Sequence, residues 1–351
     1  MEENKSLKRF TEVLFGDLFS RQDITEIVIN KIGQIFYEDD SGFHKGTNAE
    51  CERVTFENVT NFSNAVASAS KQQLTTASPI LGTTLQNDER IQIVIPPAVD
   101  KGQFSITIRK PMSKNLTLEE YQESGFFDDI VIGEHFSEED VKLAEYLENR
   151  DFLNFFKLAV ASGLKNIAIA GATGSGKTTF MKAMFWEIDA NERLITIEDV
   201  RELFSDKHEN FVNLLYPSET KITANSVTPA KLLKSCLRMK PDRILLAELR
   251  AGEAFDYIQA ISSGHGGSIT SLHAGSKDEV IRRLTLMTLQ NETGSKLPYE
   301  TARSIIEDTI DIIVHVGRIK GKRRITSLYW KDFDKVRDYL QQKRKLAEKG
   351  E

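Results

Sequence analysis

Residues 171–178, GATGSGKT, form the stretch that decides the fold. They follow the apolar run NIAIA at 166–170 and precede TFMKAMFWEI at 179–188, in which the apolar positions have helical spacing. The pattern G-x-x-x-x-G-K-[ST] between a strand and a helix is typical of a phosphate-binding loop. A glycine-rich turn without a ligand is the alternative, and the strand and helix on either side argue against it.

The residue types of this loop suit a polyphosphate. Glycines let the backbone approach the anion, so that N–H groups and the positive end of the next helix face it. Lys177 can bring an ammonium group to the β and γ phosphates, and the Thr178 hydroxyl can bind Mg²⁺. The expected nucleotide-binding residues are Gly171, Ala172, Thr173, Gly174, Ser175, Gly176, Lys177, Thr178 and Thr179.

Composition limits the classes of protein. A chain of 351 residues suits two domains, and its net charge of −6 argues against an extended surface that coats nucleic acid. Cys51 and Cys236 form no C-x-x-C pair and are most simply buried thiols of a reducing compartment. The first ten residues have no apolar signal core, and no apolar run approaches the roughly 18 residues of a membrane span. We therefore expect a cytosolic protein, at most peripheral to a membrane.

The chain divides into three parts by pattern. Residues 1–115 combine helical patterns with strand-like runs such as ITEIVIN, RIQIVIPP and FSITIRKP, which predicts an α+β N-terminal domain. Residues 116–150 are polar and acidic, and they are either an interdomain linker or a peripheral helical layer. Residues 151–351 alternate helices with short apolar strands, which predicts an α/β domain with a largely parallel sheet.

A hairpin with a basic tip is expected at 317–324, ahead of a charged terminal helix. The tip is either a solvated turn or a contact with anionic lipid or a partner.

Polar residues follow four of the expected strands. NIAIA leads into the phosphate loop, RLITI into Glu198 and Asp199, RILLA into Glu248, and GSITSL into His273. Because parallel strands place their carboxyl ends at one edge of a sheet, these groups should share that edge. Glu248 can hold Mg²⁺ with Thr178, or it can merely cap a strand end or pair with Arg243 or Arg250. Glu198 can activate the attacking water, and the sequence does not separate the metal and base roles of the two glutamates.

Three other polar residues are candidates for the site. Asp199 has less claim than Glu198, because successive strand residues face opposite sides. His265 lies in a glycine-rich turn and either takes part in catalysis or satisfies the last carbonyls of a helix. His273, beside the loop, is a candidate phosphate sensor, and no motif indicates zinc.

Four ordered segments carry a family resemblance. GATGSGKTT, ITIEDVREL, RILLAELRAGEA and GHGGSITSLHAGS resemble the Walker A loop, aspartate box, Walker B motif and histidine box of secretion traffic ATPases. ERIQIV, SITIRKP and SCLRMKPDRILLAELR resemble the type IV secretion branch. An assembly ATPase of type II secretion or type IV pili is the alternative, although those relatives commonly carry a four-cysteine zinc insertion and this chain has two cysteines.

The resemblance implies a fold and a function. The fold would be a RecA-like P-loop domain preceded by a smaller α+β domain. The protein would be a homohexameric ATPase that uses ATP and Mg²⁺ at the cytoplasmic face of a bacterial inner membrane. It would act with other inner-membrane components and ATPases of a type IV secretion system to power pilus assembly and export of DNA or protein. No sequence-specific binding of nucleic acid is expected.

The resemblance also assigns roles. Lys177 and Thr178 match the loop lysine and the metal-binding hydroxyl, Glu198 the catalytic glutamate, and Glu248 the Walker B glutamate that holds the metal. His273 and His265 belong to the histidine box. Ala247 stands where relatives often have glycine, a change too small to affect metal binding.

Two arginines complete the matched set. Arg90 and Arg109, in ERIQ and TIRKP, would reach the γ phosphate from the N-terminal domain and stabilise charge in the transition state. Without the resemblance they would be strand-end arginines paired with surface acids.

Other functions fit parts of the pattern. A nucleotide-dependent scaffold, in which hydrolysis is incidental, would use the same loop. The guanine-reading N-K-x-D is absent, which argues against a GTPase. A small-molecule kinase is not excluded by the loop alone.

Overall fold

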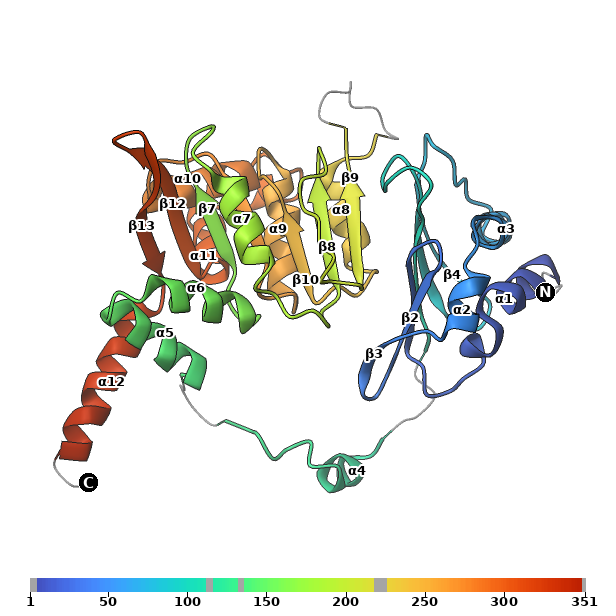
Figure 1. Cartoon of the computed structure of the whole chain (residues 1–351), viewed down its shortest axis with the longest axis horizontal. Coiled ribbons are helices and arrows are strands. Elements are labelled where there is room, and N and C mark those ends of the chain that lie inside the picture. Colours follow the sequence, from blue (N-terminus) through green and yellow to red (C-terminus); the bar gives the residue numbers. More distant parts are fainter. Residues whose placement is uncertain (1–4, 112–115, 132–135, 218–225, 349–351) are drawn as a thin grey trace.

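The computed structural model describes residues 5–111, 116–131, 136–217 and 226–348. Two sheets lie side by side, and the segment between them along the chain loops below both (Figure 1). The first sheet has six strands in the order β3-β2-β1-β6-β5-β4, and the second has seven in the order β13-β12-β7-β11-β10-β8-β9. The α/β fold with a smaller α+β unit before it is confirmed. No helix of the described residues is long and apolar enough to cross a membrane.

The first sheet is antiparallel and covered by helices on one face (Figure 1). Its core includes Phe15 and Phe62, whose rings meet edge to face at 5.0 Å. The strands are β1 (Glu26–Lys31), β2 (Gln34–Asp39), β3 (Gly42–Lys45), β4 (Ile80–Thr84), β5 (Arg90–Val94) and β6 (Ser105–Arg109). The helices are α1 (Lys5–Phe15), the 3₁₀ turn η1 (Gly16–Phe19), α2 (Asn48–Arg53) and α3 (Phe56–Ala69).

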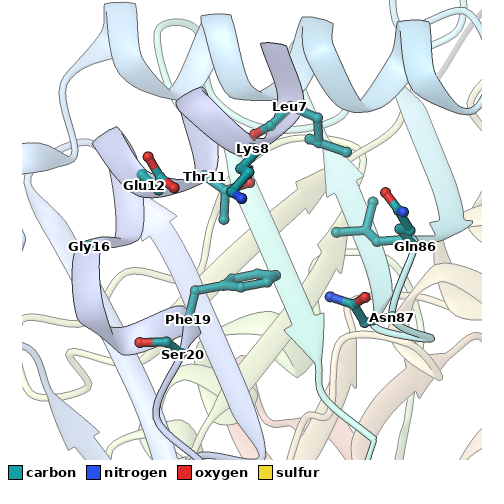
Figure 2. Close-up of a pocket in the computed structure, with 10 residues that line it drawn as sticks. Leu7, Lys8, Thr11, Glu12, Gly16, Phe19, Ser20, Gln86 and Asn87 are labelled. Carbon is teal, nitrogen blue, oxygen red and sulfur yellow. Dashed lines mark hydrogen bonds between the residues drawn. The ribbon is translucent and has the colours of Figure 1, made fainter. Parts of the chain in front are cut away.

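A cavity of about 350 Å³ opens in this first unit, between α1 and the turn that joins β4 to β5 (Figure 2). Phe19 lies between the two walls, and Gln86 and Asn87 close the turn side. None of the candidate site residues from the sequence lines it.

The second sheet is parallel from β12 to β9, and only β13 runs antiparallel. Each face carries its own apolar core: in β7, Ala168 and Ala170 pack on one side, and Ile167 and Ile169 on the other. Strands buried on both faces appear in a sequence as continuous apolar runs. The strands are β7 (Ile167–Ala170), β8 (Leu194–Glu198), β9 (Phe211–Leu215), β10 (Arg243–Leu246), β11 (Ile269–Leu272), β12 (Ile312–Ile319) and β13 (Lys322–Trp330).

Helices cover both faces of the second sheet (Figure 1). One core includes residues of α8 (Pro229–Cys236), α9 (Glu253–Ser262), α10 (Lys277–Thr288) and α11 (Tyr299–Thr309). The other includes residues of α5 (Glu138–Glu148), α6 (Phe152–Ala161), α7 (Lys177–Phe185) and α12 (Phe333–Glu348). A 3₁₀ turn, η2 (Gly294–Lys296), precedes α11. Cys236 is a buried free thiol, whereas Cys51, also free, is only half-buried.

The acidic segment 116–150 has two different halves. Helix α4 (Leu118–Glu123) begins with a capping box at Thr117 and has no buried residue. Helix α5 packs against α6 and α12, with Leu143 and Ala144 fully buried, and Asp140 pairs with Lys165 at 2.5 Å. Residues 138–148 therefore form a helical layer of the second unit, as one of the two sequence interpretations proposed. Within the segment 116–150, only the half that contains α4 runs between the two units.

A buried arginine joins the units at the amino ends of β8 and β9. Arg193 is inaccessible to solvent, and its guanidinium donates to Asn30 Oδ1 at 2.7 Å, Asn210 Oδ1 at 2.6 Å and Thr107 Oγ1 at 3.3 Å. Its Nε donates to the carbonyl of Met239 at 2.8 Å. Burial lowers the pKa of Arg193 to about 10, so the side chain stays charged at neutral pH.

Glu26, the first residue of β1, lies beside this junction with 2% of its surface exposed. Burial raises its pKa from 4.5 to about 7, although Lys240 and Arg109 oppose the shift. A carboxyl with a raised pKa keeps a proton in the folded state that the unfolded chain has lost. The contribution of Glu26 to stability therefore falls as the pH rises from about 4.5 to about 7 and is level above.

We expect Glu26→Gln to stabilise the protein at pH 8 by up to about 3 kcal/mol, because the amide carries no charge to desolvate. At pH 4 the two proteins should unfold at the same urea concentration. Glu209→Gln is the control, since Glu209 lies at the same junction and pairs with Lys45 across the units, but it is exposed. A Glu26→Gln variant that is less stable than the wild type at pH 8 would contradict the assignment.

Candidate nucleotide-binding site

The phosphate loop joins β7 to α7, and two of its positions require glycine. Gly171 has φ +154°, and a Cβ there would lie 2.2 Å from the carbonyl oxygen of Val316. Gly176 has φ +107° directly before α7. The hydroxyl of Ser175 is buried and has no hydrogen-bond partner among the described residues. The loop therefore offers an unsatisfied polar atom and a helix N-terminus to an anion.

Lys177, the first residue of α7, is folded back onto the loop. Its Nζ donates to the carbonyl of Gly171 at 2.9 Å and to that of Ala172 at 3.3 Å. Burial lowers its pKa, and the charge of Glu248 opposes this shift. A bound phosphate would offer the ammonium a charged partner in place of two carbonyls.

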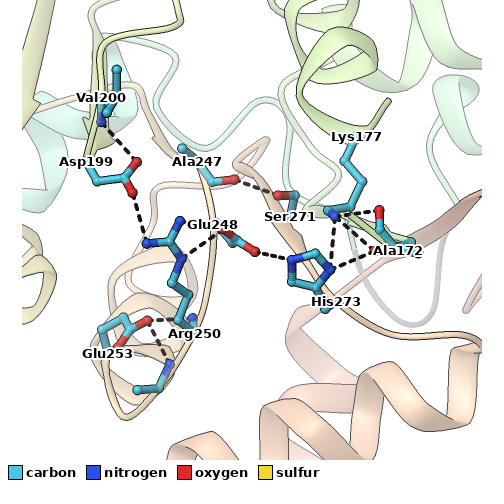
Figure 3. Close-up of polar contacts among 12 residues, drawn as sticks. Ala172, Lys177, Asp199, Val200, Ala247, Glu248, Arg250, Glu253, Ser271 and His273 are labelled. Carbon is cyan, nitrogen blue, oxygen red and sulfur yellow. Dashed lines mark hydrogen bonds and ion pairs between the residues drawn. The ribbon is translucent and has the colours of Figure 1, made fainter. Parts of the chain in front are cut away.

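His273 connects the lysine to Glu248 (Figure 3). Its Nε2 lies 2.9 Å from Glu248 Oε1, and its Nδ1 lies 3.3 Å from Lys177 Nζ and 3.1 Å from the carbonyl oxygen of Gly171. With its proton on Nε2, the ring donates to Glu248 and accepts from Lys177, and in this tautomer Nδ1 makes no hydrogen bond to the Gly171 carbonyl, which accepts from Lys177.

Arg250 extends the chain of contacts to Asp199 (Figure 3). Its Nε donates to Glu248 Oε2 at 2.9 Å, and its Nη1 donates to Asp199 Oδ2 at 2.9 Å. Although partial burial acts in the other direction, these carboxylates raise the pKa of Arg250. The carboxyl ends of β7, β11, β10 and β8 thus contribute to one polar chain.

Glu198 is not part of this chain. It is fully buried, which raises its pKa, and its Oε1 accepts the N–H groups of Glu202 and Leu203 at 3.0 and 3.1 Å. Its Oε2 accepts from Asn213 at 2.7 Å. Glu198 therefore holds the turn after β8, whereas Asp199, on the opposite side of the strand, meets Arg250. The sequence favoured Glu198 over Asp199 for catalysis, and within this chain Asp199 is the one of the two that contacts the polar chain.

His265 lies at the other edge of the sheet. It precedes β11, whose carboxyl end carries His273, and its Nδ1 lies 2.8 Å from the carbonyl oxygen of Pro241. Within this chain the structure does not bring it to the loop, and the carbonyl that it meets lies just before β10 and not at the end of a helix, as the alternative had expected.

Arg90 and Arg109 lie opposite each other on β5 and β6. Arg109 is exposed, with its Nε 3.7 Å from Glu26, which also feels the charges of Lys240 and Arg193 at the amino edge of the second sheet. Within one chain, this corner lies at the edge opposite the phosphate loop, so neither arginine meets it.

Metal ligands are few at this edge. The described residues hold no group of three or more histidine, cysteine, aspartate or glutamate side chains suited to a metal ion. Mg²⁺ bound with a nucleotide takes most ligands from phosphates and water, and one or two from protein oxygens. The half-buried Thr178 and the Glu248 carboxylate, 19% exposed, fit that requirement.

Two further cations beside the loop were not expected from the sequence. β12 lies next to β7, and beyond its contact with Ala170 it continues to Arg318, whose Nη2 is 3.4 Å from the carbonyl oxygen of Gly174. Arg323, on β13, lies with its Cδ 3.0 Å from where a Cβ on Gly176 would be. Looking for polar residues near the carboxyl ends of neighbouring strands would have identified Arg318, if the sequence had shown that β12 lies next to β7.

Comparisons with known proteins cover most of the chain. Residues 134–321 match the family model described as type II/IV secretion system protein. The type IV secretion system protein VirB11 of Brucella suis is 45% identical over 88% of this chain and 86% of its own length. PtlH of Bordetella pertussis is 42% identical over 89% and 92%. The crystal structure of the Brucella suis VirB11 ATPase in complex with sulphate matches with a TM-score of 0.86 and 42% identity, over 94% and 99% of the two chains.

Proposed function

This chain belongs to the family of type II/IV secretion system proteins, and from that premise we propose that it is a Mg²⁺-dependent ATPase that powers type IV secretion. The type IV branch predicted from the sequence is confirmed by relatives that are 42–45% identical. The observation that carries the proposal is the contact chain from Lys177 through His273 to Glu248 at the phosphate loop.

The loop and its lysine would hold the phosphates. Backbone N–H groups of residues 171–179 face the anion, and Lys177 exchanges the carbonyls of Gly171 and Ala172 for β and γ oxygens. His273 would then lose its contact with Lys177 at Nδ1 and keep its contact with Glu248 at Nε2. The contacts of His273 would therefore differ between the empty and the nucleotide-bound site.

Glu248 is the carboxylate we assign to the reacting end. Bound Mg²⁺ would be held by Thr178, Glu248 and phosphate oxygens, and it would neutralise charge on the β and γ phosphates. Glu198, buried and fully hydrogen-bonded, acts as a positioning residue for the turn that presents Asp199.

Arg90 and Arg109 require a second copy of the chain. Because they lie at the far edge of their own chain, we propose that they reach the loop of an adjacent subunit in a homohexamer. Arginines supplied in this way stabilise charge on a transferred phosphoryl group. The ring would work at the cytoplasmic face of a bacterial inner membrane with other components of the secretion system, exporting DNA or protein.

The mass of the particle tests the assembly. With Mg²⁺ and a non-hydrolysed ATP analogue, we expect light scattering to give six times the 39.7 kDa of one chain. Without nucleotide, the mass should be lower or unevenly distributed. A monomer under both conditions would leave the arginines without a route to the loop and would contradict the ring.

A further inference from the structure

We propose that Arg318 and Arg323, paired across the β12–β13 hairpin, bind the α and β phosphates of the nucleotide from the side of the loop away from Glu248. The inference rests on the proposed nucleotide site and adds two residues of the same chain to it. These are the basic residues for which the sequence suggested only solvent, lipid or a partner.

The hairpin is fixed beside the loop by backbone contacts. β12 pairs with β7 as far as His315, which lies opposite Ala170, and the next residue, Val316, places its carbonyl against Gly171. Two residues further on, Arg318 lies directly opposite Arg323. Because directly opposite residues of an antiparallel pair point to the same face, both arginines belong to one face of the hairpin.

Both side chains touch the loop. Arg318 Nη2 is 3.4 Å from the carbonyl oxygen of Gly174, a long contact, and the stem of Arg323 lies against Gly176 at the start of α7. A carbonyl is a weak partner for a guanidinium, whereas phosphate oxygens accept two parallel hydrogen bonds from it. The arginines are therefore close enough to exchange a weak contact for a strong one.

Neither arginine has an acidic partner within the part of the chain that the structure describes. Other arginines of this unit do: Arg243 pairs with Glu192, and Arg250 with Glu248 and Asp199. In a chain of net charge −6, two exposed guanidinium groups left unpaired beside a third cation, Lys177, indicate that an anion belongs between them.

The strand order indicates which phosphates they meet. β12 lies on one side of β7, and β11 and β10, which carry His273 and Glu248, lie on the other. The γ phosphate belongs on the side of Glu248, where the metal and the attacking water act. The hairpin therefore faces the α and β phosphates, which ADP and ATP share.

Single and double glutamine variants of Arg318 and Arg323 test the inference. We expect each single change to weaken the binding of MgADP and of a non-hydrolysed MgATP analogue by the same factor. That factor should be about tenfold, because this is what one hydrogen bond to a charged group contributes. KM should rise with kcat changed less than about twofold, since the contact is equal in ground and transition states. Arg→Lys should restore part of the affinity, and calorimetry gives each Kd.

Arg324→Gln is the matched control. It removes the same charge from the next residue, which pairs with Gly317 and faces the other side of the hairpin. Its Kd for both nucleotides should equal that of the wild type. Thermal melting of each variant checks that the hairpin remains folded.

Several outcomes would overturn the inference. Affinities of the Arg318 and Arg323 variants equal to that of Arg324→Gln would remove both residues from the site. A loss of affinity for the ATP analogue alone, with the affinity for ADP unchanged, would place them at the γ phosphate instead. If the variants lost binding to phosphatidylglycerol vesicles while their nucleotide Kd stayed unchanged, the two arginines would be lipid-binding residues. If the wild type bound neither nucleotide, the proposed function itself would fail, and the inference with it.

Discussion

Replacing Glu248 with glutamine should lower ATP turnover by about 10²–10³, the usual effect of removing one group that stabilises charge in a transition state. The substitution keeps the shape of the side chain but removes the negative charge of the carboxylate, whose oxygens lie 2.9 Å from His273 Nε2 and from Arg250 Nε. It also removes the carboxylate proposed to hold Mg²⁺. Affinity for MgATP should fall, whereas affinity for ATP without metal should change little.

Glu198→Gln is the comparison that gives this result its meaning. Both carboxylate oxygens of Glu198 accept hydrogen bonds from N–H groups. In glutamine an NH₂ group replaces one of these oxygens, so a donor would face an N–H donor. The variant should lose about 1–3 kcal/mol of stability and bind MgATP nearly as the wild type does. Calorimetry with and without Mg²⁺, together with urea unfolding, separates the two effects. A larger loss of Mg²⁺-dependent binding in Glu198→Gln than in Glu248→Gln would exchange their roles.

The second large effect is expected at the junction of the two units. Arg193→Met should reduce the free energy of unfolding by about 3–5 kcal/mol, the range for removing one side of a buried charged network. Asn30, Asn210 and Thr107, all buried, would lose a donor. Because two of these partners belong to the first sheet, the units should also separate more easily, seen as faster amide exchange in β1 and β6.

Arg201→Met is the control for this substitution. Arg201 also joins the units, through Asp100, but both side chains are about one-third exposed. Exposed pairs contribute about 0–1 kcal/mol, so this variant should unfold close to the wild type. Equal losses in the two variants would show that burial of Arg193 does not strengthen the junction.

The fold was predictable because its signals are local. GATGSGKT between an apolar run and a helical pattern identifies the first strand, turn and helix of the second sheet without any knowledge of distant contacts. The runs IAIA and RILL are buried on both faces, which is what continuous apolar strands indicate. Residues 138–148 were ambiguous, because a charged helix with two buried residues resembles a solvated one in sequence.

The site was predictable only where a residue ends a strand and the neighbouring strand is known. Glu248 and His273 meet that condition. Strand alternation separates Glu198 from Asp199 but does not say which of the two meets the polar chain, and only the structure shows that Asp199 contacts Arg250. Arg318 depends on the adjacency of β12 and β7, which lie about 150 residues apart and which no local pattern specifies.

The measurement that tests the central claim most directly is phosphate release from ATP by the purified chain with Mg²⁺, beside Lys177→Ala. The wild type should turn over ATP slowly and faster as it assembles, and lose this activity in EDTA. Lys177→Ala should fold normally and release no phosphate above background, because its loop lacks the ammonium for the β and γ phosphates. Equal rates in the two proteins would contradict the account, since hydrolysis would then take place outside the phosphate loop.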